Sequence, residues 1–345
     1  MTNSFLSSNA KYGGLVKKKA TKLLRNYLFL LIGYIDTISP HFLSMHTIIS
    51  VFRIFQLVAP AFFASSMRFW PEGSLQQKII SVTSVAFHIV PVEYRFEASI
   101  YIEFIYFFIV LAYFVILLSS ALIYQKSSKL PKQVVSIISA VDRSVMLLIH
   151  PIALQMASQD LSRIIMGLDT YSSYSLHIFG VVITYLSCLI YSYTYAKTMS
   201  VTLLFRPVSL LTTSNVPQLY LMFLTYIATV TSALASYLSV IPYTILTVIT
   251  AVLLFLMSCI PFLPASFART LDMKLVFSSG VTGGILSLLV AIYAIIGRHA
   301  SMVVLFIGFG AFVISMIATF PVIENYERKC LKVLDEISDD QNVAE

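Results

Sequence analysis

Long apolar runs follow one another along most of the chain, separated by short polar segments. Six runs carry almost no charge and reach the ~20 residues that a helix needs to cross a bilayer core of about 30 Å. They lie at Ala98–Tyr124, Tyr174–Ala196, Pro217–Val240, Pro242–Ala265, Val276–Ile296 and Ser301–Ile323. Because these runs are continuous rather than alternating, they predict transmembrane helices and not the strands of a β-barrel.

Two further runs contain charged residues and are also expected to span the membrane. Met45–Ser66 includes Arg53, and Gln133–Met156 includes Asp142 and Arg143. An ionisable side chain in a bilayer is costly, so it normally faces a partner or a water-filled cavity. These two spans are therefore the first places to look for function.

The basic segments predict the orientation, because cytoplasmic loops carry an excess of Lys and Arg. Residues 1–26 are basic without any acid, and Gln125–Lys132 holds three lysines and no acid. Both segments are expected in the cytoplasm, so an even number of crossings separates them. Two short or interrupted runs, Tyr27–Leu43 and Ile79–Val92, therefore either both cross or both stay partial. We expect eight spans, with ten as the alternative, and both termini in the cytoplasm.

Composition agrees with this class of protein. The 345 residues are 58% hydrophobic and only 11% charged, whereas soluble domains average about 25% charged residues. Soluble enzymes, DNA-binding domains and disordered tails are thereby excluded, and the net charge of +7 is attributed to the inner loops. The prediction is an all-α polytopic bundle: a basic cytoplasmic segment 1–26, a transmembrane domain 27–323 and a cytoplasmic tail 324–345.

One stripe of polar residues falls on a single helix face of the first charged span. Its members are His46, Ser50, Arg53, Gln56 and Pro60. One interpretation is a substrate or ion path along this face. The other is a structural ion pair in which Arg53 reaches Asp142 in the second charged span.

The second charged span offers a similar choice. Asp142 or Arg143 lies near one stripe with His150, an arrangement that a proton relay would use. However, Asp142 and Arg143 are about 100° apart on a helix, so each can also satisfy a different neighbour. His150 precedes Pro151 near the end of the span, where its ring is expected to reach the interface.

Two stripes of small or hydroxyl residues are interpreted as packing surfaces. Close approach of helix backbones is predicted at Gly280, Gly283, Gly284, Ser287 and Ala291. Hydrogen bonds between helices are predicted at Thr225, Thr229, Ser232 and Ser236. Cys188, Cys259 and Cys330 are scattered, and no phosphate-binding or zinc motif occurs. We therefore predict no catalytic, cofactor or metal site and no nucleic-acid partner.

After Ile323 the sequence becomes mixed in charge. Glu324 and Arg328 are spaced for an ion pair along one helix face. Apolar positions at helical spacing follow at Cys330, Val333, Leu334 and Ile337. The tail is expected to be an amphipathic helix that continues the last span. The tail is interpreted either as a solvated end or as a connector to a cytoplasmic signalling partner. The other expected partners of the chain are the lipid bilayer and a second copy of itself in a homo-oligomer.

Several local patterns resemble the N-terminal membrane region of large protist proteins, of the parabasalid type, that end in a nucleotide cyclase domain. The patterns are Arg53–Gln56, Arg68–Glu72, Ser128–Lys132, His150–Ala153, Ser162–Ile165, Pro261–Ser266 with Arg269–Thr270, and Arg328–Asp335. The resemblance implies a membrane region that precedes cytoplasmic sensor and cyclase segments. Class III cyclases position nucleotide phosphates with two metal-binding aspartates in an α/β domain. The 345 residues hold no such domain, so no catalytic residue is carried over.

The leading hypothesis is therefore a non-enzymatic membrane sensor or anchor of the cyclase-associated type, expected in the plasma membrane. It is either a short relative that keeps only the membrane region or a piece of a longer protein. The alternative is a small-solute or ion transporter that uses Arg53 with Asp142 and Arg143. A membrane-embedded enzyme ranks third, because no paired carboxylates or His/Asp cluster is visible at usable spacing.

Overall fold

A computed structural model of the chain describes most of the residues after position 73 and scattered positions before it. The described residues are 28, 30–35, 38, 48, 52, 56, 58–59, 70, 73–88, 95–141, 145–167, 174–198, 215–263, 270–297 and 301–343. All regular structure among them is helical. His46, Arg53, Asp142 and Arg143 lie outside the described residues, and so does the basic segment 1–26.

Five helices in the described residues are long and apolar enough to cross a membrane. They are α5 (Arg95–Ser127), α8 (Tyr174–Thr198), α10 (Val240–Cys259), α11 (Thr270–Ile296) and α12 (Met302–Val343). A helix is the expected form for these runs, because a backbone in lipid must satisfy its hydrogen bonds internally. The helical membrane character predicted from the sequence is confirmed, and these five helices coincide with five of the six uncharged runs.

The remaining helices are α4 (Leu75–His88), α6 (Lys132–Ala140), α7 (Met146–Met166) and α9 (Asn215–Ala235), with a short 3₁₀ turn η4 (Ile260–Phe262) after α10. In α9, the sixth uncharged run, the described apolar stretch is the shorter Tyr220–Ala235.

The predicted span Gln133–Met156 corresponds to the two helices α6 and α7, and α7 continues through the polar residues after Met156 to Met166. Gly167 ends α7 in the left-handed conformation, with φ of 59°, and its N–H donates to the Ile164 carbonyl. Glycine adopts this conformation without steric cost.

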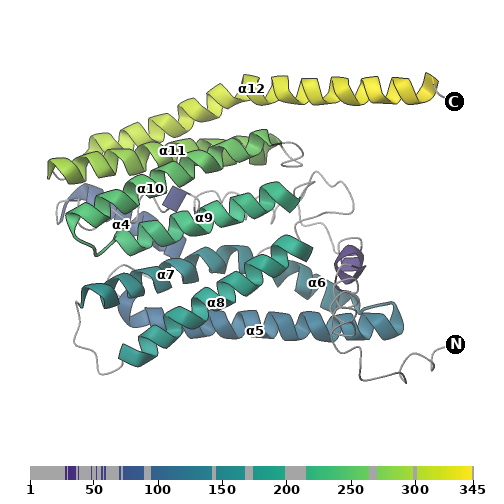
Figure 1. Cartoon of the computed structure of the whole chain (residues 1–345), viewed down its shortest axis with the longest axis horizontal. Helices are drawn as coiled ribbons and strands as arrows, with labels where there is room; N and C mark the ends of the chain where they lie inside the picture. Colours follow the sequence, from purple (N-terminus) through teal and green to yellow (C-terminus); the bar gives the residue numbers. More distant parts are fainter. Residues whose placement is uncertain are drawn as a thin grey trace, which may run out of the picture.

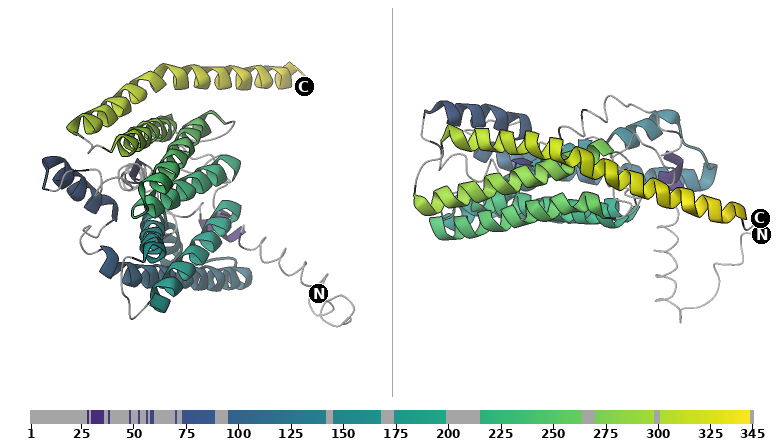
Figure 2. Two further views of the ribbon diagram at one scale, coloured as in Figure 1. Left: turned by 60° about the vertical axis from the view of Figure 1, so that its left-hand side comes forward. Right: turned by 90° about the horizontal axis from the view of Figure 1, so that it is seen from above.

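The helices run back and forth along one common direction (Figure 1). α7 packs against α5, α8 and α9, while α9, α10, α11 and α12 follow one another as neighbours. α12 extends past the other helices at one end, which is visible from two further directions (Figure 2). The exposed lysines Lys126, Lys129 and Lys132 lie at this same end, where α5 and α6 meet.

The glycines of α11 lie directly against α10. A Cβ atom at Gly280 would meet the Leu254 carbonyl oxygen at 2.6 Å, and one at Gly284 would meet the Phe255 ring at 2.7 Å. The predicted close approach of helix backbones is therefore confirmed.

The predicted hydroxyl stripe of α9 behaves differently. Thr225 and Thr229 donate to carbonyl oxygens one turn earlier in α9 itself, at 2.6 and 2.9 Å. Between α9 and α10, Thr225 also donates to Sδ of Met257 at 3.8 Å, as the sequence predicts, and the hydroxyls of Thr231 and Thr250 lie 2.8 Å apart. A threonine in a helix has a backbone carbonyl within reach one turn back, so it does not need a partner on another helix.

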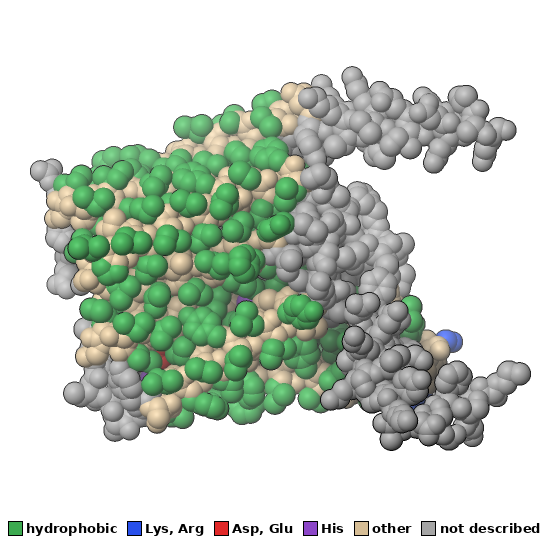
Figure 3. All heavy atoms as spheres, in the orientation of Figure 1, with side chains coloured by type: hydrophobic (Ala, Val, Ile, Leu, Met, Phe, Trp, Pro, Cys, Tyr) green, Lys and Arg blue, Asp and Glu red, His purple; other side chains and the backbone are tan. Residues whose placement is uncertain are grey.

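The outer surface is apolar where it is described. Among the coloured side chains of the face in Figure 3, hydrophobic ones predominate, and only isolated acidic and histidine atoms lie between them. Large residues such as Phe306 and Phe309 on α12 and Tyr101 on α5 stand out from the bundle, each about 70% exposed. A surface of this kind is stable in lipid and unfavourable in water.

Candidate functional site: a buried acid–histidine cluster

Two acidic residues and one histidine come together inside the bundle, where α5, α7 and α8 meet. Asp160 of α7 and His177 of α8 are both buried, and Oδ2 of the aspartate lies 2.7 Å from Nδ1 of the histidine. The Ser99 hydroxyl also hydrogen-bonds the Asp160 carboxylate, and the Arg163 guanidinium attracts it electrostatically. We call Glu103, Asp160 and His177 the acid–histidine cluster.

Glu103 of α5 is the unusual member of the cluster. Its side chain is 0% exposed, and within the described part of the chain neither carboxylate oxygen has a hydrogen-bond partner. It is close enough to Asp160 for the two carboxylates to interact electrostatically. Buried polar groups are nearly always hydrogen-bonded, and a charged one without a partner is very unfavourable. The position of Glu103 therefore calls for a reason other than stability.

The sequence of α8 makes room for this carboxylate. His177, Gly180, Thr184 and Cys188 follow helical spacing and form the buried face of α8. At Gly180 a Cβ atom would overlap Oε2 of Glu103. Since any other residue would occupy that space, the glycine lets α8 approach α5 with the carboxyl group between them.

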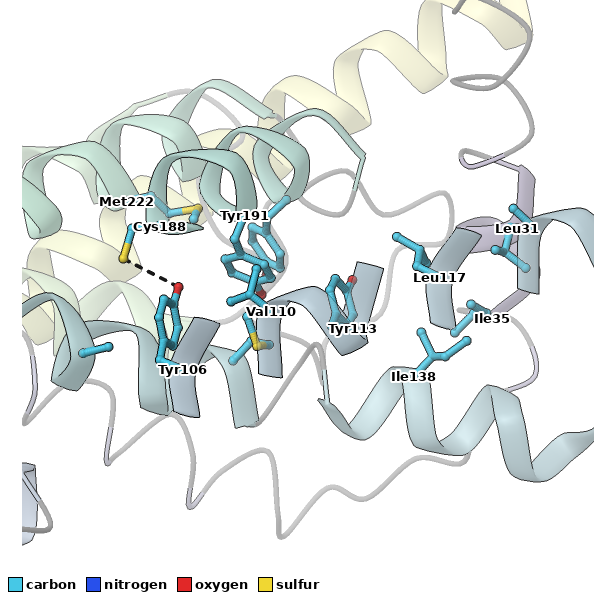
Figure 4. Packing of buried hydrophobic residues seen from close by; sticks show 14 of the residues in the cluster. Leu31, Ile35, Tyr106, Val110, Tyr113, Leu117, Ile138, Cys188, Tyr191 and Met222 are labelled. Atoms are coloured by element: carbon cyan, nitrogen blue, oxygen red, sulfur yellow. Dashed lines mark hydrogen bonds between the residues drawn. The ribbon is translucent and has the colours of Figure 1, made fainter. Parts of the chain in front are cut away.

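A second polar group lies deeper in the same bundle. The Tyr106 hydroxyl of α5 hydrogen-bonds Nδ1 of His150, and Nε2 of His150 lies 3.3 Å from Oγ of Ser192. Cys188 of α8 points toward the same tyrosine, with its thiol 3.6 Å from the hydroxyl (Figure 4). The Tyr226 ring of α9 covers the imidazole, with ring centroids 4.5 Å apart.

One pair of hydroxyls lies between the two groups. The Tyr185 hydroxyl of α8 is 2.7 Å from the hydroxyl of Ser158 on α7, and Tyr185 interacts electrostatically with Glu103. The result is a series of protonatable and hydroxyl groups through the interior of α5, α7 and α8. We call this series the buried polar chain; its members are His177, Asp160, Glu103, Ser158, Tyr185, Tyr106, His150 and Ser192.

The acid–histidine cluster lies at the end of the bundle opposite to Lys126, Lys129 and Lys132. Glu103 is in the third turn of α5, His177 is at the start of α8, and Asp160 is in the last two turns of α7. These three helix ends lie together at the end of the bundle from which α12 does not project (Figure 1). The cluster is therefore near one end of the bundle, whereas His150 lies further inside.

Two of the residues predicted as site residues lie in the described part of the chain. Gln56 is buried and donates from Nε2 to the Leu148 carbonyl oxygen of α7 at 3.0 Å. His150 belongs to the buried polar chain; it is 0% exposed, so its predicted place at the interface was wrong. Tyr106 and Ser192 supply partners for its ring nitrogens, so the ring does not need water.

Sequence analysis did not identify the acid–histidine cluster itself. Glu103 is the single charged residue in the run Ala98–Tyr124, which is a signal that could have been used. Asp160 follows the predicted span Gln133–Met156 and was therefore not counted among the charges within the spans. Its position in α7 became clear only from the helix boundary at Met166.

The donor set does not fit a metal ion. Searched over the described residues, no group of three or more His, Cys, Asp or Glu side chains is arranged to hold one. Comparison of the chain with protein-family models, with curated proteins and with solved structures finds no match.

Proposed function

We propose that this chain is a non-enzymatic membrane protein that conducts protons, and that its proton path is the buried polar chain. The observation that carries the proposal is Glu103, a carboxyl group inside an apolar helix with no hydrogen-bond partner among the described residues. Ionisable residues within membrane spans are rare and mark proton relays and ion pathways. If Glu103 served only to stabilise the fold, its carboxylate would be expected to have a hydrogen-bond or ion-pair partner.

The chemistry of the path follows from its residue types. Carboxyl, imidazole and hydroxyl groups can each accept a proton or hydrogen bond and pass one on. Glu103 carries its proton while it is unpaired, because an isolated carboxylate is far less favourable there than the neutral acid. It releases the proton when Asp160 or His177 moves to within hydrogen-bonding distance. Beyond His150, buried Tyr113, Tyr191 and Tyr195 continue toward the other end of the bundle.

The direction of the path follows from the proposed topology of eight spans with both termini in the cytoplasm. Under that topology the end with Lys126, Lys129 and Lys132 is cytoplasmic, as the positive-inside rule requires. The acid–histidine cluster then lies near the outer surface, and protons enter there. The plasma membrane is the membrane we propose.

Proton uptake by purified protein in lipid vesicles tests the proposal. A pH-sensitive dye is trapped inside the vesicles, and valinomycin is present to balance charge. When acid is added outside, the interior of vesicles with wild-type protein should acidify faster than that of protein-free vesicles. Glu103→Gln keeps the shape and hydrogen-bonding capacity of the side chain but removes the titratable proton. We expect the rate to fall to that of protein-free vesicles.

The matched control is Glu324→Gln, the same chemical change at an exposed position on α12. It should leave the rate unchanged. A wild-type rate no greater than that of protein-free vesicles would refute the transport function. An unchanged rate in the Glu103 variant would remove the buried polar chain from the path.

A second candidate is the membrane input region of a signalling protein, which the resemblance to cyclase-domain proteins implies. It is favoured by α12, which continues as one helix from Met302 to Val343 and leaves the bundle. Such a helix can transmit a movement of the bundle to a cytoplasmic partner. Reading the transcript past the codon for Glu345 tests this candidate. A cyclase domain in the same frame would support it, and a stop codon would count against it.

A further inference from the structure

A cavity of about 360 Å³ opens between α8 and α9, beside the buried polar chain. It arises because α7 packs closely against both helices while α8 and α9 contact each other over only a few residues. Leu154 of α7 and the buried side chains of Cys188 and Met222 form its inner wall. Figure 4 shows Cys188 and Met222 side by side, above Tyr106.

The mouth of the cavity opens on the apolar outer surface of the bundle. Leu189 and Tyr193 of α8 and Phe223 of α9 line it, and each is more than 60% exposed. Two of these three residues lie within the membrane span Ser175–Tyr195. The cavity is thus continuous with the apolar outer surface, at a depth where the surrounding solvent is lipid hydrocarbon.

The lining decides the chemistry of the occupant. Among the described residues that line the cavity there is no Lys, Arg, Asp or Glu, and the wall that they form is almost entirely carbon. A charged group would be desolvated there without compensation. At about 30 Å³ for each water-sized group, the volume corresponds to roughly twelve such groups. A linear hydrocarbon chain meets these conditions.

We propose that the cavity between α8 and α9 binds one acyl chain of a membrane phospholipid, which enters sideways from the bilayer. Phospholipid is the source because its chains already surround the mouth, and its headgroup can stay in the interface while one chain turns inward. The site does not depend on proton transport. Tyr185, Cys188 and Ser192 belong to the cavity wall and also contact the polar interior. A chain bound there keeps water away from His150.

Photolabelling tests the proposal. Purified protein is placed in phosphatidylcholine vesicles that contain a trace of phosphatidylcholine with a diazirine near the end of one acyl chain. After irradiation, the labelled residues are mapped by mass spectrometry. Cys188 and Met222 are only 4% and 2% exposed, so only a chain inside the cavity can reach them. We expect label on Met222 at a level comparable to that on the exposed Phe223.

Filling the cavity provides the decisive variant. Met222→Trp should lower the labelling of Cys188 by about tenfold, because the indole ring takes the space of the chain. Val252→Trp places the same ring on the outer face of α10, where Val252 is exposed, and should leave the labelling unchanged. Circular dichroism and elution volume confirm folding, and Val230→Phe is the substitute if Met222→Trp does not fold.

Two outcomes would overturn the proposal. Label confined to exposed residues such as Leu189 and Phe223 would mean that lipid touches the surface without entering. Label on Met222 from a free diazirine-bearing dodecanol, with none from the phospholipid, would mean that the occupant is a free lipophile.

Discussion

His177→Ala should lower the free energy of unfolding by about 3 kcal/mol, because it leaves the Asp160 carboxylate buried without its histidine partner. The two side chains are both buried and lie 2.7 Å apart. Breaking a buried pair by removing one partner is more damaging than removing the pair, since the remaining charge keeps its desolvation cost. Ser99 and Arg163 still act on Asp160, which places the loss at the lower end of the usual range.

The aspartate gives the informative comparison. Asp160→Asn removes the charge but keeps an oxygen that His177 can bond, so it should cost only about 1 kcal/mol. The double variant Asp160→Asn/His177→Ala should then be more stable than His177→Ala alone. Reversible unfolding in mixed micelles of mild detergent and sodium dodecyl sulfate measures all three variants. Equal losses for the two single variants would contradict the role given to the remaining charge. A His177→Ala loss below about 0.5 kcal/mol would show that the pair is not stabilising.

Much of the fold could be predicted because membrane spans obey a local rule. A continuous apolar run must form a helix in lipid to satisfy its backbone hydrogen bonds. The runs at Ala98–Tyr124 and Val276–Ile296 accordingly lie within α5 and α11. The glycine stripe of α11 was also predictable, since helical spacing places Gly280 and Gly284 on neighbouring parts of one surface.

The candidate site depends on contacts between distant segments and could not be predicted in this way. The sequence shows Glu103, Asp160 and His177 but not that three different helices bring them together. Each alone has an ordinary explanation, such as a helix end or a loop. Charge in the predicted spans directed attention to Arg53 and Asp142, which lie outside the described residues.

His150 illustrates the same limit from the other side. Its type and position suggested a ring that reaches water at the end of a span. The structure supplies partners from α5 and α8 instead, namely Tyr106 and Ser192. A histidine can therefore be buried in a membrane helix when two other helices offer hydroxyl groups, and only the packing reveals whether they do.

The packing of α11 on α10 leads to the second large effect. Gly280→Ala should lower the free energy of unfolding by about 2 to 3 kcal/mol, because the added methyl group has no room. Its carbon would lie 2.6 Å from the Leu254 carbonyl oxygen and 2.9 Å from the Ser258 backbone nitrogen. Backbone atoms cannot rotate away as a side-chain tip can, so the two helices must separate.

Gly310→Ala is the matched control, and its expected effect has the opposite sign. Gly310 lies inside α12, and a Cβ atom there would meet nothing within 4 Å. Alanine is a better helix former than glycine by up to about 1 kcal/mol, so this variant should be slightly more stable than wild type. The same unfolding measurement applies to both variants. If Gly280→Ala and Gly310→Ala shift stability in the same direction, the contact between α10 and α11 is not what makes Gly280 necessary.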